Sequence, residues 1–262
     1  DCHTPMILAI DVGNTNIVLG CMDADTGKLH FTARLASDRL KTSDEYAAVM
    51  RNMFILNQVE RHSIEGGIIS SVVPPLTVTM KDAVRQLCGR ESLVVGAGLK
   101  TGLNIVMDNP AQLGSDLVTD AVAAVAEYPK PILIFDLGTA TTLSVVDGKG
   151  SYIGGMIMPG ISLSLEALSS RTSQLPHISL EGPKRLIGTN TVDCMKSGIV
   201  YGSAAMLDGM IARVTRELGE KPTVVATGGL APHITKYCES EIICDNTLIL
   251  KGLRILYNKN KA

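Results

Sequence analysis

The same short pattern occurs twice in this chain, and no other feature constrains the fold as strongly. The stretch ILAIDVGNTNIVLG covers residues 7–20, and ILIFDLGTATTLSV covers residues 132–145. In each copy an apolar run leads into an aspartate, a glycine bend follows, and a second apolar run begins. Two apolar runs joined by a glycine bend predict a β-hairpin. Because a turn and a further apolar stretch follow each hairpin, we expect two similar units that each begin with three strands.

Segments with helical spacing alternate with short apolar runs along the rest of the chain. Helices are predicted over residues 44–59, 76–88, 115–128, 162–170, 191–218 and 232–237, and strands at GGIISSVVPP, SLVVGA and PTVVATGG. This alternation is typical of an α/β fold. The prolines of EYPKP, residues 127–131, mark a boundary. We therefore predict two domains, residues 6–127 and 131–262, with a cleft between them.

Composition and charge narrow the range of functions. The chain has 262 residues, 45% of them hydrophobic, and a formal net charge of −2. No basic face or arm indicates nucleic-acid binding, and no apolar run approaches the roughly 18 residues of a membrane span. The first residues, DCHTPM, lack the pattern of a signal peptide. We therefore expect a cytoplasmic protein without nucleic-acid or membrane partners, and Met6 as its natural start.

The cysteines and histidines form no recognisable ligand pattern. No cysteine belongs to a CxxC pair, and none has a histidine at zinc-finger spacing. Free thiols in a reducing compartment are therefore expected. The five histidines are scattered, and we expect them to be structural or exposed. The cysteines are Cys2, Cys21, Cys88, Cys194, Cys238 and Cys244.

The two hairpin bends have the composition of phosphate cradles. Glycine and threonine in a tight bend can direct several N–H and hydroxyl groups at one point, and such a concavity binds phosphate oxygens. A carboxylate beside a phosphate is useful when a cation lies between them. Asp11 and Asp136 are therefore candidate cation anchors beside two cradles, which suits a nucleoside triphosphate. An isolated Asp-x-Gly would more simply be a turn, but its duplication after two buried strands favours the ligand.

Two further stretches carry candidate site residues. In VVATGGL, residues 224–230, adjacent glycines would let a base or sugar approach the backbone, which suggests an adenosine pocket or merely a strand-to-helix turn. In DNPAQLGSD, residues 108–116, Asp116 opens a predicted helix whose N-terminus favours the ionised carboxylate. Phosphoryl transfer needs a carboxylate that accepts the hydroxyl proton. Asp120 could compete for this role, and Asp116 could simply cap the helix.

Six motifs follow one another along nearly the whole chain from Met6. They are DVGNTN (11–16), DNPAQLGSD (108–116), DLGTATT (136–142), GGMIMPGI (154–161), IGTNTVDCMKSGIVYG (187–202) and ATGGLAP (226–232). In their order and spacing these motifs resemble those of type III pantothenate kinases, members of the actin-like ATPase and sugar-kinase superfamily.

The resemblance implies duplicated actin-like, ribonuclease H-like domains with the nucleotide in a cleft between them. It implies ATP-dependent phosphorylation of pantothenate to 4′-phosphopantothenate, the first step of coenzyme A biosynthesis. ATP with Mg²⁺ and a monovalent cation, K⁺ or NH₄⁺, are the implied cofactors. The resemblance also implies a homodimer whose acceptor site lies close to the subunit interface.

Residue roles carry over by motif. Asp11 would lie near Mg²⁺, directly or through water, Asp136 would bind the monovalent cation, and Asp116 would be the proton acceptor. The roles of Asp136 with potassium and of Thr191 rest on the resemblance alone. The implied ATP-binding residues are Asp11, Val12, Gly13, Asn14, Thr15, Asn16, Ile17, Val18 and Thr139. The implied pantothenate-site residues are Met107, Gly114, Ser115, Asp116, Leu117 and Thr191.

The sequence departs from the family pattern at two positions of the acceptor site. Many members have Arg directly after the catalytic Asp, where this chain has Leu117, and Tyr two residues before Asn-Pro, where it has Met107. Arginine would pair with the acceptor's carboxylate, and a hydrogen bond of that kind is worth about 1.5–3 kcal/mol. Two alternatives therefore stay open: a same-fold kinase for another small hydroxylated acceptor, and a non-catalytic regulatory paralogue. The intact Asp11, Asp116 and Asp136 argue against the second.

Overall fold

The computed structural model describes residues 4–262, which divide into two compact units. Unit 1 contains residues 4–103, 109–123 and 247–262, and unit 2 contains residues 104–108 and 124–246. The predicted second domain, residues 131–262, is therefore too long at its C-terminal end. The last helix of the chain, α7 (Leu248–Asn260), packs on strands of unit 1 instead. Cys2 lies outside the described residues.

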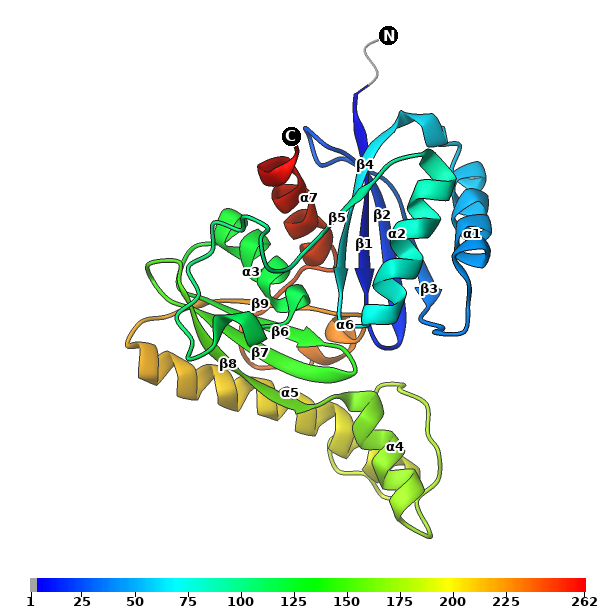
Figure 1. Cartoon of the computed structure of the whole chain (residues 1–262). Coiled ribbons are helices and arrows are strands. Elements are labelled where there is room, and N and C mark those ends of the chain that lie inside the picture. Colours follow the sequence, from blue (N-terminus) through cyan, green and yellow to red (C-terminus); the bar gives the residue numbers. More distant parts are fainter. Residues whose placement is uncertain (1–3) are drawn as a thin grey trace. The chain divides into compact units, whose positions relative to one another are not determined.

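Unit 1 is built on a five-stranded mixed sheet in the order β3-β2-β1-β4-β5 (Figure 1). β1 pairs antiparallel with β2 and parallel with β4. The strands are β1 (Met6–Val12), β2 (Asn16–Asp23), β3 (Leu29–Ala36), β4 (Ile64–Ser71) and β5 (Ser92–Val94). The helices besides α7 are α1 (Ser43–Leu56), α2 (Pro74–Cys88), the 3₁₀ turns η1 (Arg61–Ser63) and η2 (Pro110–Gln112), and α3 (Ser115–Glu127), whose residues 124–127 belong to unit 2.

The two faces of the unit 1 sheet bury different elements. Leu8, Ile10 and Val12 belong to a core that includes buried side chains of α1 and α2. Alternate residues of a strand point to opposite faces, so Ile7 and Asp11 face the other way. On that face, Leu250 and Tyr257 of α7 lie against glycines of β2 and β4. Asp11 therefore ends β1 on the side away from α1 and α2.

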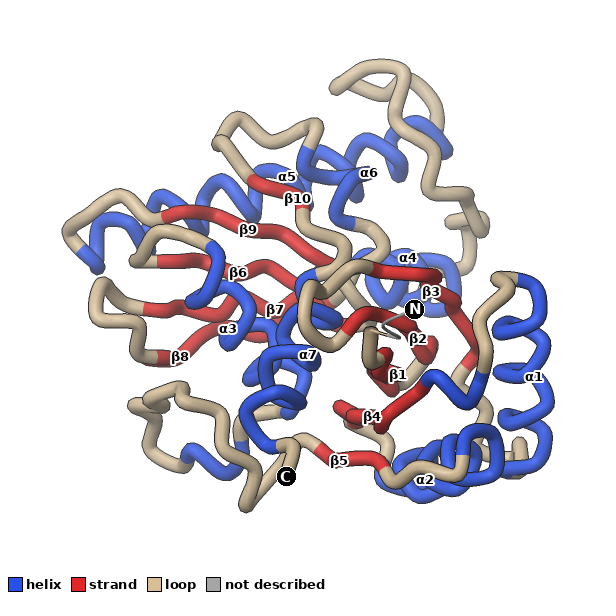
Figure 2. Tube along the Cα trace, turned by 90° about the horizontal axis from the view of Figure 1, so that it is seen from above, coloured by secondary structure: helices blue, strands red, loops and turns tan. Residues whose placement is uncertain are grey.

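Unit 2 repeats this plan in a second five-stranded sheet, in the order β10-β9-β6-β7-β8 (Figure 2). β6 pairs antiparallel with β7 and parallel with β9, as β1 does with β2 and β4. The strands are β6 (Ile132–Leu137), β7 (Ala140–Val146), β8 (Tyr152–Pro159), β9 (Thr223–Thr227) and β10 (Ile243–Cys244). The helices are α4 (Ile161–Arg171), α5 (Thr191–Leu218) and α6 (Ala231–Thr235).

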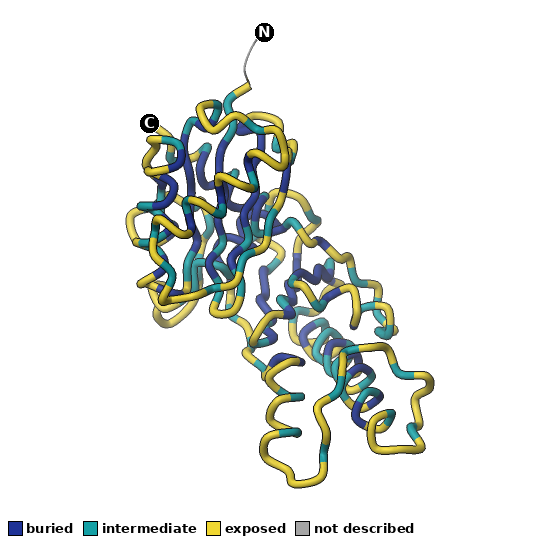
Figure 3. The backbone as a smooth tube through the Cα atoms, turned by 90° about the vertical axis from the view of Figure 1, so that its right-hand side faces the viewer, coloured by how far each residue is buried: buried dark blue, intermediate teal, exposed yellow. Residues whose placement is uncertain are grey.

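The duplication predicted from the sequence extends to the direction of side chains. Leu133, Phe135 and Leu137 face a core shared with α5 and α6, and Asp136 points to the opposite face. The predicted α/β class and both hairpins with a third strand are confirmed. Buried residues run along the strands of each sheet, whereas the segment from α4 to the start of α5 is largely exposed (Figure 3).

Local signals explain where several helices begin and end. Thr42 and Glu45 form a capping box at the start of α1. The two prolines predicted to end a strand open α2, since proline at the first helical position needs no N–H partner. Gly219, with φ of 74°, ends α5, which runs unbroken over 28 residues.

Candidate active site

The bend between β1 and β2 is the first of the two bends that the sequence suggested as phosphate cradles. The Gly13 N–H donates to the Asn16 carbonyl at 2.9 Å, which closes the bend. From the end of β3, the Ser37 hydroxyl donates to the Gly13 carbonyl at 2.6 Å, and its N–H donates to the Thr15 carbonyl at 2.9 Å. Asn14 and Thr15 are exposed at the tip. The bend is thus held in one shape, with its tip accessible to a ligand.

Asp116 lies in the first turn of α3, as predicted. Its Oδ1 lies against Gly114, where an added Cβ would come within 2.6 Å of it. Burial raises the pKa of Asp116 above its ordinary value, although hydrogen bonds from the backbone N–H groups of Leu117 and Asp116 act in the opposite direction. Asp120 is only 3% exposed, whereas Asp116 is partly exposed. Asp116 is therefore the more accessible of the two candidate bases, and it lies in the first turn of its helix.

The corresponding bend in unit 2 is shaped by two close backbone approaches. Gly228 follows β9 with φ of 94°, and a Cβ there would lie 2.8 Å from Asp136 Oδ1 and 2.6 Å from the Leu137 carbonyl. Gly160, after β8, lies directly against the Thr139 carbonyl. Side chains at either glycine would displace the bend, because the neighbouring atoms are mostly backbone. Thr139 itself is exposed.

The surroundings of Asp136 suit a cation. Asp136 pairs across the sheet with Thr142 of β7 and with Thr227 of β9, so the three side chains share one face. The Thr142 Oγ1 is buried and has no hydrogen-bond partner among the described residues. A buried hydroxyl without a partner is costly, and a cation bound beside Asp136 would give the Thr142 oxygen a partner.

Thr191 opens α5 and lines a hollow of about 570 Å³ within unit 2. The helix start is fixed because the Asn190 side chain accepts the Asp193 N–H at 2.9 Å. A volume in this range accommodates a small organic ligand. The hollow is lined by Leu175, Gly188, Thr189, Asn190, Thr191, Cys194 and Met195.

The predicted site residues fall into two sets. Residues 11–18 and 114–117 lie in unit 1, at the end of β1 and the start of α3. Met107, Asp136, Thr139 and Thr191 lie in unit 2. Leu117 is partly buried and Met107 is 37% exposed.

Comparison with known proteins decides what this repeated arrangement belongs to. A family model described as type III pantothenate kinase matches residues 7–213. The chain belongs to the type III pantothenate kinase family. It is 45% identical over 256 residues to a type III pantothenate kinase of Exiguobacterium sp., covering 98% of this chain and 100% of that protein. It is 44% identical over 255 residues to one of Halalkalibacterium halodurans, covering 97% and 100%.

Solved structures of distant proteins share the fold of this pantothenate kinase family member. One is assigned to the Baf family of transcriptional activators, from Campylobacter jejuni, with a TM-score of 0.59, 17% identity, and coverage of 97% of this chain and 98% of that one. Another is the activator of 2-hydroxyisocaproyl-CoA dehydratase from Clostridium difficile, with a TM-score of 0.54, 12% identity, and coverage of 96% and 93%. At such identities they bear on the fold alone. They agree with the predicted duplicated actin-like domains.

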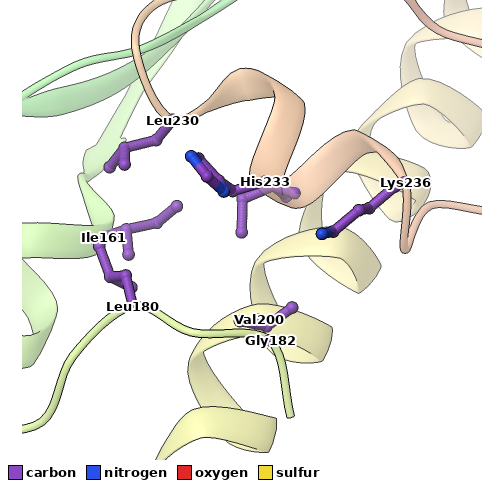
Figure 4. Close-up of a pocket in the computed structure, with 8 residues that line it drawn as sticks. Ile161, Leu180, Gly182, Val200, Leu230, His233 and Lys236 are labelled. Carbon is purple, nitrogen blue, oxygen red and sulfur yellow. The ribbon is translucent and has the colours of Figure 1, made fainter.

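A small cavity of this family member is lined by Leu230 and by α6, which follow the glycines where the sequence suggested an adenosine pocket. Its space is about 20 Å³, which suits about one water molecule. Figure 4 shows His233 and Lys236, from α6 and its C-terminal end, among the lining residues, with the apolar Ile161 and Leu180 next to each other on another side of the cavity. An adenine ring would need more room than this cavity offers, so the adenosine pocket stays a prediction.

Metal-binding clusters would involve the described histidine, cysteine and acidic side chains, and disulfides would involve the cysteines. Among residues 4–262, no group of three or more His, Cys, Asp or Glu side chains is arranged to hold a metal ion. The five described cysteines are free thiols. Burial raises the pKa of Cys21 to about 12 and of Cys88 to about 11, so these thiols stay protonated at neutral pH.

Sequence reasoning missed three residues that shape the family site. Ser70 of β4 pairs in register with Asp11, Thr142 faces the same way as Asp136, and Gly160 supports the Thr139 bend. The strand predictions placed Ser70 and Thr142 near the correct strand ends. Ser70 bonds to Ser115, which is distant in sequence, so no local pattern marked it. Thr142 and Gly160 lie inside the motifs DLGTATT and GGMIMPGI, but the sequence alone assigned them no role.

Proposed function

We propose that this protein phosphorylates pantothenate with ATP to give 4′-phosphopantothenate, the first step of coenzyme A biosynthesis. The observation that carries the proposal is the duplicated strand–Asp–Gly bend, with Asp116 at the start of α3, in a chain of this kinase family. One bend in each unit would bind phosphate oxygens through N–H and hydroxyl groups. Residues 11–18 and Thr139 would bind ATP.

In the proposed transfer, the acceptor's hydroxyl oxygen forms a bond to the γ-phosphorus of ATP. The bond from that phosphorus to the β–γ bridging oxygen breaks, and ADP leaves. Asp116 accepts the hydroxyl proton. Its raised pKa makes it a better base than an ordinary carboxylate, provided that it is ionised at the working pH.

Two cations fit the carboxylates. Asp11, at the end of β1, would hold Mg²⁺ together with ATP phosphates, and bound Mg²⁺ would neutralise charge on the phosphates. Asp136 would hold K⁺ or NH₄⁺. The buried Thr142 hydroxyl on the same face supports a cation there, because its oxygen has no protein partner among the described residues.

The residues proposed to bind the acceptor are Gly114, Ser115, Asp116 and Leu117 of unit 1, and Met107 and Thr191 of unit 2. Leu117 and Met107 bring no charge to this set, and both are apolar. This favours, as a second candidate, a related hydroxylated acceptor that lacks the carboxylate. A non-catalytic regulatory role would require the three aspartates to be idle.

An acceptor panel separates these functions. ADP release is measured with ATP, Mg²⁺ and K⁺, and with pantothenate, with its alcohol analogue pantothenol, or with no acceptor. We expect saturable release with pantothenate. A kcat/KM for pantothenol at least about tenfold higher, equivalent to about 1.4 kcal/mol, would assign a carboxylate-free acceptor, since an unpaired carboxylate is disfavoured by an energy of about this size. ATP binding without any acceptor-dependent release would contradict both kinase functions.

We also propose that the protein is a cytoplasmic homodimer that pairs through α5. The exposed side of this helix carries only small residues for four turns, at spacings of four and three. A Cβ at Gly198, Gly202 or Gly209 would meet nothing within 4 Å, so packing within the chain does not require these glycines. Each glycine lowers the stability of an exposed helix by about 1 kcal/mol relative to alanine. Close packing of a second α5 against these glycines would offset this loss. The stripe comprises Gly198, Gly202, Ala205, Gly209 and Ala212.

Light scattering tests the dimer directly. The expected mass is twice that of the chain of 27.8 kDa, and a monomer at micromolar concentration would contradict the proposal. Among residues 4–262, no helix is both long and apolar enough to cross a membrane.

A further inference from the structure

Ser70 is a fully buried polar residue at the end of a central strand. It lies on β4 with 0% of its surface exposed, in register with Asp11 on the neighbouring β1. Because paired residues of adjacent strands point to the same face, the Ser70 and Asp11 side chains share the face away from α1 and α2. The Ser70 side chain therefore lies next to that of Asp11, the residue predicted to lie near Mg²⁺, on the same face of the sheet.

The hydroxyl of Ser70 bonds to the start of α3. Its Oγ lies 3.1 Å from the Ser115 Oγ, and the Ser115 Oγ lies 3.1 Å from the Ser71 carbonyl. A carbonyl can only accept, so the single hydroxyl hydrogen of Ser115 is committed to Ser71. Ser70 must then be the donor in the bond between the two hydroxyls. The direction of both hydrogen bonds follows from this chemistry alone.

The same turn of α3 is held from its other side. The Thr119 hydroxyl donates to the Ser115 carbonyl at 2.6 Å, and Gly252 of α7 lies directly against the Thr119 carbonyl. Thr119 is fully buried. The start of α3 is thus fixed by β4 through Ser70 and by α7 through Thr119, and Asp116 lies between these two attachments.

We propose that Ser70 is a positioning residue for phosphoryl transfer, which holds Ser115 and the adjacent Asp116 in place for the acceptor hydroxyl. The proposal rests on the proposed kinase function. Ser70 also sets what Ser115 can offer: one hydrogen is given to Ser71, one lone pair is used by Ser70, and one lone pair is left. Ser115 can therefore only accept a hydrogen bond from a substrate, which selects a donor such as a hydroxyl or an amide N–H.

The test compares Ser70→Ala with Ser92→Ala as a matched control. Ser92 is a buried serine of the same sheet whose hydroxyl has no hydrogen-bond partner among the described residues. For Ser70→Ala we expect kcat to fall about tenfold, the loss associated with one hydrogen bond, with the Kd for ATP unchanged. The first turn of α3 should exchange its amide hydrogens faster. For Ser92→Ala both readouts should match the wild type.

A second variant separates positioning from a loss of stability. In a Ser115→Ala background, Ser70 has lost its acceptor, so adding Ser70→Ala should lower kcat no further. An additive loss would overturn the proposal, and so would a single Ser70→Ala variant with wild-type kcat and wild-type exchange. If Ser70→Ala does not fold, Ser115→Ala alone must show faster exchange in α3, or the proposal fails.

The outcome also distinguishes this inference from the proposed function. A wild-type protein without acceptor-dependent turnover would contradict the kinase function, and the exchange of α3 would then decide whether Ser70 fixes that turn. A wild-type protein that turns over pantothenate, with an unaffected Ser70→Ala variant, would overturn only the role of Ser70.

Discussion

Asp116→Asn is expected to lower kcat by about 100- to 10,000-fold, the usual contribution of a positioned proton acceptor. Asparagine keeps the shape of the side chain but cannot accept the acceptor's proton. The phosphate cradle at residues 13–16 does not involve Asp116, so the Kd for ATP should change little. Single-turnover formation of ADP and calorimetric binding of ATP measure the two quantities separately.

The matched control is Asp44→Asn, which removes an exposed carboxylate from the first turn of α1. It should keep full activity. Wild-type kcat/KM should rise with pH as Asp116 ionises, and the midpoint should lie above the ordinary carboxyl range because burial raises the Asp116 pKa. Asp116→Asn should lack this rise. Substantial activity of Asp116→Asn would exclude Asp116 as the base.

Asp136→Ala is expected to abolish activation by K⁺ and to lower kcat/KM by about 10- to 100-fold or more. Losses of about 10- to 100-fold are typical when a residue that only hydrogen-bonds to a metal ligand is removed, and Asp136 is proposed to bind the cation itself. Asp136 supplies the only carboxylate in the row formed with Thr142 and Thr227. Alanine leaves that row without a negative charge for a cation. Initial rates across a titration of KCl, at ionic strength held constant with choline chloride, measure the effect.

Asp147→Ala serves as the control for Asp136→Ala. Asp147 lies in the turn after β7, where its carboxylate accepts the N–H groups of Lys149 and Ser151 at 2.9 Å. Its loss should weaken the turn without changing the K⁺ concentration needed for half-maximal rate. Activation by K⁺ that survives in Asp136→Ala would place the monovalent cation elsewhere.

The parts of the fold that the sequence predicted are those with strong local patterns. Each hairpin joins two apolar runs through a glycine bend, so its existence follows from the local pattern. The face to which Asp11 and Asp136 point became clear only from the structure, because the residues before each aspartate in its strand are all apolar. The predictions missed α7 and β10. β10 has only two residues, and α7 contains Gly252 in its middle, which weakens a helical pattern. Nothing local shows that α7 packs on the first sheet rather than the second.

In the candidate site, too, residues within a local sequence pattern were predicted, and residues whose role depends on distant contacts were not. Asp116 could be predicted because glycine, serine and aspartate directly precede a helical pattern. Ser70 could not, because its role depends on a bond to Ser115, 45 positions away in the chain. The shape of the Thr139 bend likewise depends on Gly160, which only the strand pairing of β7 and β8 brings near.

The central claim is that this chain transfers the γ-phosphoryl group of ATP to pantothenate. The most direct measurement incubates the protein with ATP, Mg²⁺, K⁺ and pantothenate and determines the product by mass spectrometry, with Asp116→Asn in parallel. We predict a species with the mass of pantothenate plus one phosphoryl group, formed in step with ADP and absent with Asp116→Asn. ADP and inorganic phosphate without that species, or no turnover despite ATP binding, would contradict the account.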